Sequence, residues 1–180
     1  MFINHDQLVS YIENKIGNLS SGVYVADLGC GSGGLSLSLA KKMNKKGRVY
    51  AVDIQKNLLE MVDAHAQAKS YDNLLTVWSD IEDIGSVIIP DNSLDIIILS
   101  NVMHQISVRD NVAKTLKQLL RKNGQFVCID WNDSFDGMGP RSDMLFTMHH
   151  AHQWCEDNDF FINRVDTIND YHYGMVGSIR

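Results

Sequence analysis

Apolar residues along the chain alternate between two kinds of spacing, and this alternation predicts alternating strands and helices. Short runs of consecutive or alternating apolar residues are typical of β-strands. Such runs occupy Val23–Asp27, Gly47–Asp53, Asn73–Ser79, Ser93–Ser100 and Gly124–Asp130. The fourth run is apolar on consecutive residues, which predicts a strand covered on both faces.

Between these runs, apolar residues recur at the spacing of one helix face. The positions that mark these helices are Leu35, Leu39 and Met43, then Leu58, Met61, Val62 and Ala66, and then Val112, Leu116 and Leu119. Ser107 and Asp110 match a capping box before the third helix, and Arg121–Gly124 has the composition of a helix stop. Further helices are expected over roughly Asp6–Ile16 and Ser142–Asp157.

Strands that alternate with helices predict an α/β fold, a parallel sheet with helices on both faces. The last two strand-like runs, Phe160–Val165 and Tyr171–Ile179, are separated by too few residues for a crossover helix. We therefore expect them to pair as an antiparallel hairpin. The fold class is a mostly parallel α/β sheet with an antiparallel last strand.

The segment VADLGCGSGG, Val25–Gly34, places four glycines directly after the first strand. In open α/β sheets, ligands bind at the carboxyl ends of the strands, and glycine lets the backbone approach a ligand closely. GCGSGG fits the dinucleotide pattern G-x-G-x-x-G, and Asp53 ends the second strand, where a carboxylate can accept hydrogen bonds from a ribose. These features fit NAD and other adenosine ligands equally well.

Asp27 favours an adenosine ligand that carries positive charge. Its carboxylate, two residues before Gly29, would repel a pyrophosphate but suits the amino group and sulfonium of S-adenosylmethionine. A chain of 180 residues also leaves little room for the separate substrate domain of a dehydrogenase. A nicotinamide-dependent oxidoreductase stays an alternative.

The chain resembles the class I S-adenosylmethionine-dependent methyltransferases. Within that fold it is similar to the methyltransferase type 11 group, which includes ubiquinone/menaquinone and arsenite methyltransferases. The segments that carry the resemblance are VADLGCGSGG, VYAVDIQKNLLEM, SDIEDI, LDIIILSNVMHQI and LLRKNGQFVCIDW. The resemblance implies a Rossmann-like seven-stranded sheet of order 3-2-1-4-5-7-6. It also implies one methyltransferase domain over residues 1–180, with residues 1–22 as a short helical cap.

The resemblance further implies which residues bind S-adenosylmethionine. They are Asp27, Gly29 and Gly31 at the methionine part, Asp53 at the ribose hydroxyls, Ile54, Asp80 and Ile81 around the adenine, and Ser100 and Asn101 beside the methyl donor. Asp80 would accept from the adenine amino group, and the backbone N–H of Ile81 would donate to the ring.

His104 is the candidate catalytic residue, because it follows the fourth strand and a histidine can accept a proton at neutral pH. The alternative is that it packs beneath the cofactor. Another helix carries His149, His152 and Glu156, which we interpret as its polar flank, so no metal site is predicted. Three cysteines at unrelated spacings, Cys30, Cys128 and Cys155, raise arsenite as an acceptor, but small buried cysteines are the commoner case.

The acceptor side of the site is less defined by the sequence. An aromatic and methionine-lined pocket for a flat, apolar small molecule is one interpretation of Trp131, Phe135, Met138, His172 and Tyr173, and loop packing is the other. Trp131 and Tyr173 are the preferred candidates for pocket walls. Since one short helix precedes the first strand, either the pocket is open or a second copy of the chain covers it in a homodimer.

Composition limits the remaining possibilities. A net charge of −6 and a pI near 5.5 give no basic footprint for nucleic acid or a membrane surface. No apolar run approaches the ~20 residues of a membrane span, no signal peptide precedes the first strand, and the cysteine pattern fits a reducing compartment. We therefore expect a cytoplasmic S-adenosylmethionine-dependent methyltransferase with a small-molecule acceptor. The alternatives are a catalytically degenerate donor-binding sensor or partner subunit, and the oxidoreductase.

Overall fold

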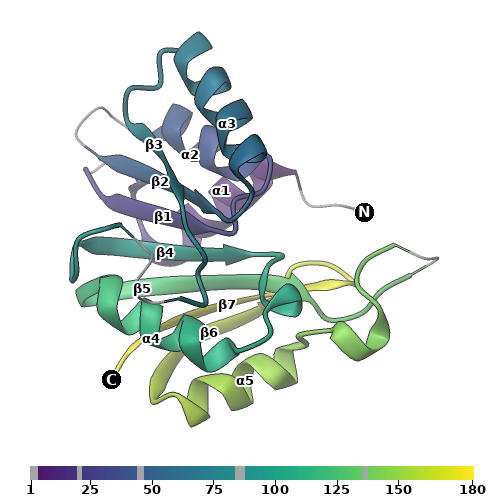
Figure 1. Cartoon of the computed structure of the whole chain (residues 1–180). Coiled ribbons are helices and arrows are strands. Elements are labelled where there is room, and N and C mark those ends of the chain that lie inside the picture. The colour runs from purple at the N-terminus through teal and green to yellow at the C-terminus, as the bar shows by residue number, and fades with distance from the viewer. Residues whose placement is uncertain (1–3, 20–21, 44–46, 84–87, 136–137) are drawn as a thin grey trace.

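A computed structural model of the chain describes residues 4–19, 22–43, 47–83, 88–135 and 138–180. The elements, in chain order, are α1 His5–Ile16, β1 Tyr24–Leu28, α2 Gly34–Lys42, β2 Arg48–Asp53, α3 Lys56–Ala68, β3 Leu74–Trp78, β4 Leu94–Ser100, the 3-10 turn η2 Met103–Gln105, α4 Arg109–Leu119, β5 Leu120–Trp131, the 3-10 turn η3 Ser142–Met144, α5 Met148–Asp157, β6 Phe160–Thr167 and β7 His172–Ile179. Figure 1 shows these elements arranged around a single twisted sheet.

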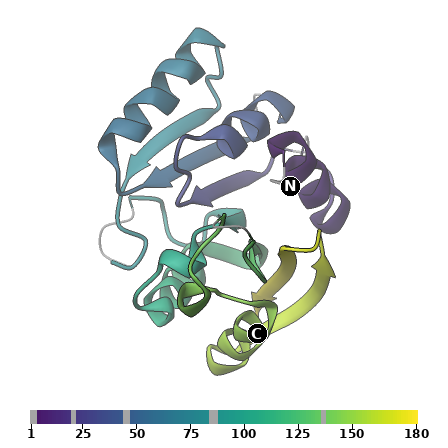
Figure 2. The same cartoon turned by 90° about the vertical axis from the view of Figure 1, so that its right-hand side faces the viewer.

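The strands form one sheet of order β3-β2-β1-β4-β5-β7-β6 (Figure 2). The pairs from β3 to β5 are parallel, whereas β7 runs antiparallel to both β5 and β6. The predicted order and the antiparallel hairpin are therefore confirmed. Strand order reverses between β1 and β4, so the carboxyl ends of these two strands flank the crevice where α/β sheets bind ligands.

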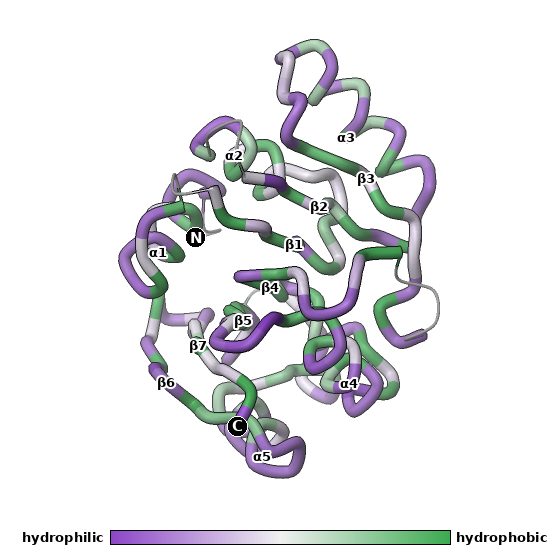
Figure 3. Tube along the Cα trace, turned by 90° about the vertical axis from the view of Figure 1, so that its left-hand side faces the viewer, coloured by the Kyte–Doolittle hydropathy of each residue, from purple (hydrophilic) through white to green (hydrophobic). Residues whose placement is uncertain are grey.

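The strand residues bury both faces of the sheet in two apolar clusters. In β4, Ile96 and Ile98 pack on the side of α1, α2 and α3, while Ile97 and Leu99 pack on the side of α4 and α5. The consecutive apolar run therefore reflects a strand that is covered by helices on both faces, as predicted. Figure 3 shows hydrophobic stretches along the central strands and hydrophilic residues along the outer side of the helices.

The helix predicted over Ser142–Asp157 is wrong in its first half. Ser142–Met144 is only the short turn η3, and α5 begins at Met148. The Thr147 side chain accepts a hydrogen bond from the His150 backbone N–H at 3.3 Å, so Thr147 is the N-cap that sets this start. Phe146, just before the cap, is buried in the core.

Around α4, one expectation is confirmed and one is wrong. The helix ends at Leu119, just before the predicted stop at Arg121–Gly124, and that segment belongs to β5, which begins at Leu120 because Leu120 pairs with Leu94. The capping box of Ser107 and Asp110 is absent, since the N-cap of α4 is Val108 and it has no side-chain cap. The carboxylate of Glu82 instead accepts hydrogen bonds from the backbone N–H groups of Ser107 and Val108, at 3.2 and 2.5 Å.

Candidate cofactor-binding site

The glycine turn between β1 and α2 depends on residues without side chains. Gly29 has φ +77°, and a Cβ atom there would lie 2.4 Å from a Val102 methyl group. The Gly29 and Cys30 backbone N–H groups donate to the Val52 carbonyl at 2.8 and 3.0 Å, which fixes the turn against β2. Gly31, at φ +54°, has open space where a Cβ would stand. The turn therefore leaves bare backbone at the strand ends.

Two cavities meet at Gly29, one on each side of the turn. The first, called the Asp53 pocket, has a volume of about 280 Å³ and is lined by Gly29, Gly31, Asp53, Ile54, Gln55, Ser79, Asp80, Ile81, Glu82, Val102, Gln105 and Ile106. The second, called the Asp27 pocket, measures about 340 Å³ and is lined by His5, Leu8, Asp27, Gly29, Cys30, Ser32, Gly34, Leu35, Ser100, Asn101 and His172. Each of the predicted cofactor-binding residues lines one of these two pockets, so the structure brings them together.

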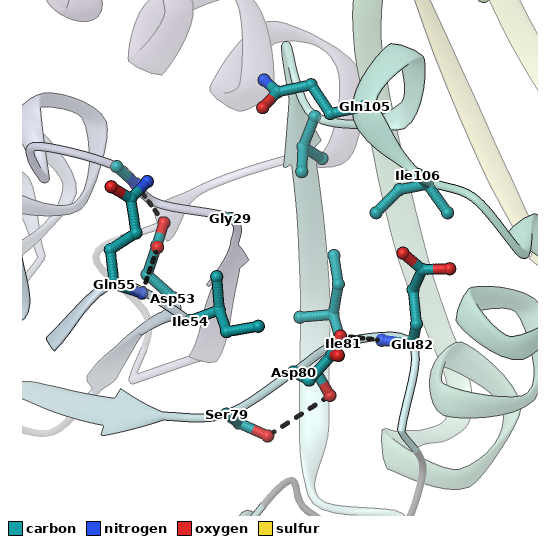
Figure 4. A pocket seen from close by; sticks show the side chains of 12 residues that line it. Gly29, Asp53, Ile54, Gln55, Ser79, Asp80, Ile81, Glu82, Gln105 and Ile106 are labelled. Atoms are coloured by element: carbon teal, nitrogen blue, oxygen red, sulfur yellow. Dashed lines mark hydrogen bonds between the residues drawn. The ribbon is translucent and has the colours of Figure 1, made fainter.

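The Asp53 carboxylate organises the first pocket. Its Oδ2 accepts a hydrogen bond from the Gly31 backbone N–H at 2.8 Å, and its Oδ1 accepts from the Gln55 N–H at 2.9 Å (Figure 4). The residue is 7% exposed. Because each carboxylate oxygen can accept more than one hydrogen bond, Asp53 holds the turn and still presents acceptor capacity to the cavity.

The far side of the Asp53 pocket combines a second carboxylate with apolar walls. Asp80 follows β3, and its Oδ1 accepts a hydrogen bond from the Glu82 backbone N–H at 2.9 Å. Figure 4 shows Ile54, Ile81 and Ile106 around the space between the two carboxylates. An apolar slot with an acceptor at each end fits a flat heterocycle joined to a sugar.

The Asp27 pocket presents hydrogen-bond acceptors in a buried setting. The Ser36 hydroxyl donates to Asp27 Oδ2 at 2.6 Å, and Asp27 is 2% exposed. Burial raises the pKa of Asp27 to about 6, an effect that the Ser36 hydrogen bond opposes. Asn101 has φ +54°, and its buried Oδ1 has no hydrogen-bond partner among the described residues. A buried carboxylate and an unpaired carbonyl oxygen together favour a ligand that donates hydrogen bonds or carries positive charge.

His104 lies on η2 but lines neither pocket. Its Nδ1 is 2.8 Å from Asp130 Oδ1, and its side chain is 11% exposed. The neighbouring residues Val102 and Gln105 do line the Asp53 pocket. The structure thus places the predicted catalytic residue next to the pockets and pairs it with a buried carboxylate, which spacing along the sequence does not reveal.

Among the residues weighed as acceptor-pocket walls, His172 lines a cavity and Met138 is exposed, while the three others pack against neighbouring side chains. Trp131 is buried with its ring centroid 4.1 Å from that of His172, and Phe135 stacks on Tyr171 at 4.2 Å. Tyr173 is fully buried beside the Cys128 sulfur, so the expectation that it forms a pocket wall is wrong. His172, the residue before Tyr173, faces the opposite side of β7 and lines the Asp27 pocket.

The cysteines and histidines weighed for soft-acceptor or metal chemistry do not form a site in the described part of the chain. Cys128 and Cys155 are buried, and burial raises the pKa of all three thiols, that of Cys155 to about 12. No group of three His, Cys, Asp or Glu side chains in the described ranges is placed to hold a metal ion. Nor is any helix in those ranges both long and apolar enough to cross a bilayer.

Comparison with known proteins identifies the family. The profile of the methyltransferase domain family matches residues 19–173. Demethylmenaquinone methyltransferase of Symbiobacterium thermophilum is 25% identical over 114 residues, which are 63% of this chain and 45% of that protein. Arsenite methyltransferase of Aquipseudomonas alcaligenes is 30% identical over 116 residues, 62% of this chain and 34% of that protein. This chain thus spans less than half the length of these two curated relatives.

Solved structures give the same fold. A SAM-dependent methyltransferase from Aquifex aeolicus superposes with a TM-score of 0.84 at 23% identity, over 93% of this chain and 87% of that one. A putative type 11 methyltransferase from Sulfolobus solfataricus has a TM-score of 0.74 at 24% identity, over 96% and 92%. The fold is that of the class I S-adenosylmethionine-dependent methyltransferases. The chain belongs to the methyltransferase domain family.

Proposed function

We propose that this protein transfers a methyl group from S-adenosylmethionine to a small-molecule acceptor. The observation that carries the proposal is the pair of pockets that meet at Gly29, one with an apolar slot between carboxylates and one with the buried acceptors of Asp27 and Asn101. Adenosine and a cationic amino acid are the two halves of one ligand that match these pockets. The family membership of the chain supports the same ligand.

The residues present fit this donor at both ends. The buried and unpaired Asn101 Oδ1 and the buried Asp27 carboxylate would accept from its ammonium group and offset its positive charge. Asp53 would accept from the ribose hydroxyls, and Ile54 and Ile81 would flank the adenine. When bound, the donor supplies a methyl group on a positively charged sulfur, which leaves as a neutral thioether.

The acceptor class is supported by the relatives alone. Several of them are named for quinone substrates, namely demethylmenaquinone and 2-phytyl-1,4-naphtoquinone, and one for arsenite. We infer that a naphthoquinone in its reduced form belongs first in an acceptor panel. Arsenite belongs beside it, although the buried thiols of Cys128 and Cys155 do not favour it.

Calorimetric titration with S-adenosylmethionine, S-adenosylhomocysteine and NADH tests the donor. We expect the two adenosyl ligands to bind, Asp53→Asn to weaken both at least tenfold, and Glu60→Gln on the exposed surface of α3 to change neither. Binding of NADH alone would contradict the proposal and favour the oxidoreductase. Donor binding with no methylated product from the acceptor panel would favour the sensor or partner subunit.

A further inference from the structure

We propose that Asp130 is a positioning residue that holds His104 as a base with its Nε2 free, and that the acceptor is therefore a group that must lose a proton. This inference rests on the proposed methyl transfer and adds the substrate class: a hydroxyl, a thiol or an acidic carbon. It starts from the contact between His104 Nδ1 and Asp130 Oδ1, which are 2.8 Å apart.

The hydrogen bonds of Asp130 determine which imidazole nitrogen carries the proton. Asp130 is completely buried at the end of β5. Its Oδ1 also accepts from the Trp131 backbone N–H at 2.8 Å, and its Oδ2 accepts from the His104 backbone N–H at 3.3 Å. Two backbone donors favour the ionised carboxylate, which can only accept. His104 must then donate from Nδ1, and its Nε2 keeps a lone pair.

The pair of His104 and Asp130, called the dyad, lies at the same sheet edge as the two pockets. His104 belongs to η2, which follows β4 directly, and the residues around it in sequence line both cavities: Asn101 the Asp27 pocket, and Val102 and Gln105 the Asp53 pocket. Asp130 stands opposite Tyr173 in the β5–β7 register, one step from the pair of Trp131 and His172. A base at this edge is next in sequence to residues that would contact a methyl donor held in both pockets.

The charged and titratable groups around the dyad do not change its hydrogen bond, in which His104 donates and Asp130 accepts. Burial lowers the pKa of His172 on β7, an effect that the Asp130 charge opposes and the His104 charge reinforces. His172 therefore stays neutral at neutral pH. Arg109 of α4 donates from Nε to the Met103 carbonyl at 3.1 Å and braces η2 from the other side. Asp130 is thus the carboxylate that stabilises a proton on His104.

The proton and the electrons balance in a single displacement. The acceptor X–H gives its proton to His104 Nε2, and the X–H bonding pair becomes the new bond from X to the methyl carbon. The pair of the broken carbon–sulfur bond stays on sulfur, which cancels its positive charge. The imidazolium, stabilised by Asp130, then releases the proton to water. An acceptor that attacks through an existing lone pair, such as arsenite, would not need this step.

Imidazole nitrogen spectroscopy tests the positioning role without any acceptor. In ¹⁵N-labelled protein with S-adenosylhomocysteine, we expect long-range ¹H–¹⁵N spectra to show His104 with its proton on Nδ1. In Asp130→Asn we expect a mixture of tautomers at His104. His65, exposed on α3, provides the matched control signal and should be identical in both proteins. A His104 proton on Nε2 in the wild type would overturn the inference.

Kinetics with naphthalene-1,4-diol and with arsenite test the base itself. We expect His104→Gln to lower kcat for the diol by about 10²–10⁴-fold, the range for general bases, with little change in KM. Asp130→Asn should lower kcat by a smaller factor than His104→Gln does, and His65→Gln should leave kcat unchanged. An unchanged kcat in His104→Gln, or turnover of arsenite alone, would overturn the inference. Failure of the wild type to bind S-adenosylmethionine would instead overturn the proposed function.

Discussion

Single carboxylates at the strand ends serve the fold and the site at once. Asp53 accepts from the backbone N–H groups of Gly31 and Gln55, so it joins the glycine turn to the residue before α3, while it also lines a pocket. Asp27 accepts a hydrogen bond from Ser36, and burial of its charge costs free energy that a cationic ligand would offset. The buried Asp27 carboxylate therefore favours the binding of a positively charged group.

Donor binding should depend on pH through Asp27. Its pKa is raised to about 6, so the side chain is neutral below that pH and loses its attraction for a cation. We expect the affinity for S-adenosylmethionine to fall about tenfold between pH 7 and pH 5, as measured by calorimetry.

Asp27→Asn is the control for that pH dependence. The variant should bind more weakly at pH 7 and lose most of the slope, because it removes the titrating carboxylate from the pocket. The raised pKa also means that the folded protein binds more protons than the unfolded chain between about pH 4 and 6. Relative to the variant, the wild type should therefore lose stability as the pH rises from about 4 to 6. An unaltered slope in Asp27→Asn would contradict this account.

At the scale of residues, sequence spacing identifies groups that follow strands but not the groups that meet across them. Asp27, Asp53 and Asp80 each lie at or just past the carboxyl end of a parallel strand, so their convergence follows from parallel topology. The pairing of His104 with Asp130 joins residues 26 positions apart, and nothing in their spacing marks it. Likewise, the unpaired Asn101 Oδ1 depends on the conformation of its own backbone.

At the scale of elements, α4 is anchored at its start by a residue from another part of the chain. The Glu82 carboxylate accepts from the Ser107 and Val108 N–H groups, which would otherwise lack partners at the first turn. Glu82→Ala should therefore lower the free energy of unfolding by about 1–2 kcal/mol, as measured by urea denaturation.

Glu60→Ala is the matched control for Glu82→Ala, because Glu60 is an exposed glutamate on α3. We expect its effect to stay within about 0.5 kcal/mol of zero, the usual range for surface substitutions. Equal effects of the two substitutions would mean that Glu82 does not cap α4.

The two errors at helix starts have different physical causes. A capping box is a local pattern, and it predicts correctly only where the cap is local. For α4 the cap comes from Glu82, 25 residues earlier than Ser107. For α5 the cap is local, at Thr147. The prediction failed there because the residues before Thr147 have the apolar spacing of a helix, although Phe146 is buried in the core before the helix begins. The strands and the closing hairpin were predicted because apolar runs and connection lengths report them directly, whereas the strand order came from the family resemblance.

At the scale of the whole molecule, the first helix is tied to the last hairpin. Asp166 on β6 accepts hydrogen bonds from Lys15 Nζ at 2.9 Å and from the Tyr11 hydroxyl at 3.1 Å. Burial raises the pKa of Asp166, but these two bonds outweigh that effect and lower it overall. Since His5 and Leu8 of the same helix line the Asp27 pocket, this attachment positions one wall of the site.

Asp166→Asn should loosen α1 without unfolding the sheet. We expect faster hydrogen exchange at the amides of Leu8, Val9 and Ile12, and a severalfold weaker affinity for S-adenosylmethionine. Because the pair is partly exposed, the change in unfolding free energy should stay near 1 kcal/mol. Asp159→Asn, at an exposed residue 3.9 Å from Arg180, is the control and should leave exchange in α1 unchanged. Unchanged exchange in Asp166→Asn would show that α1 is held by its apolar contacts alone.

The position of β7 between β5 and β6 has a consequence for synthesis on the ribosome. Strand β5 is complete at Trp131, but its outer edge pairs only with β7, which ends at Ile179. A growing chain that has emerged as far as Thr167 therefore carries an unpaired and apolar strand edge, a surface that invites aggregation. Translation pauses or chaperones that act in this interval would bear directly on the yield of active protein.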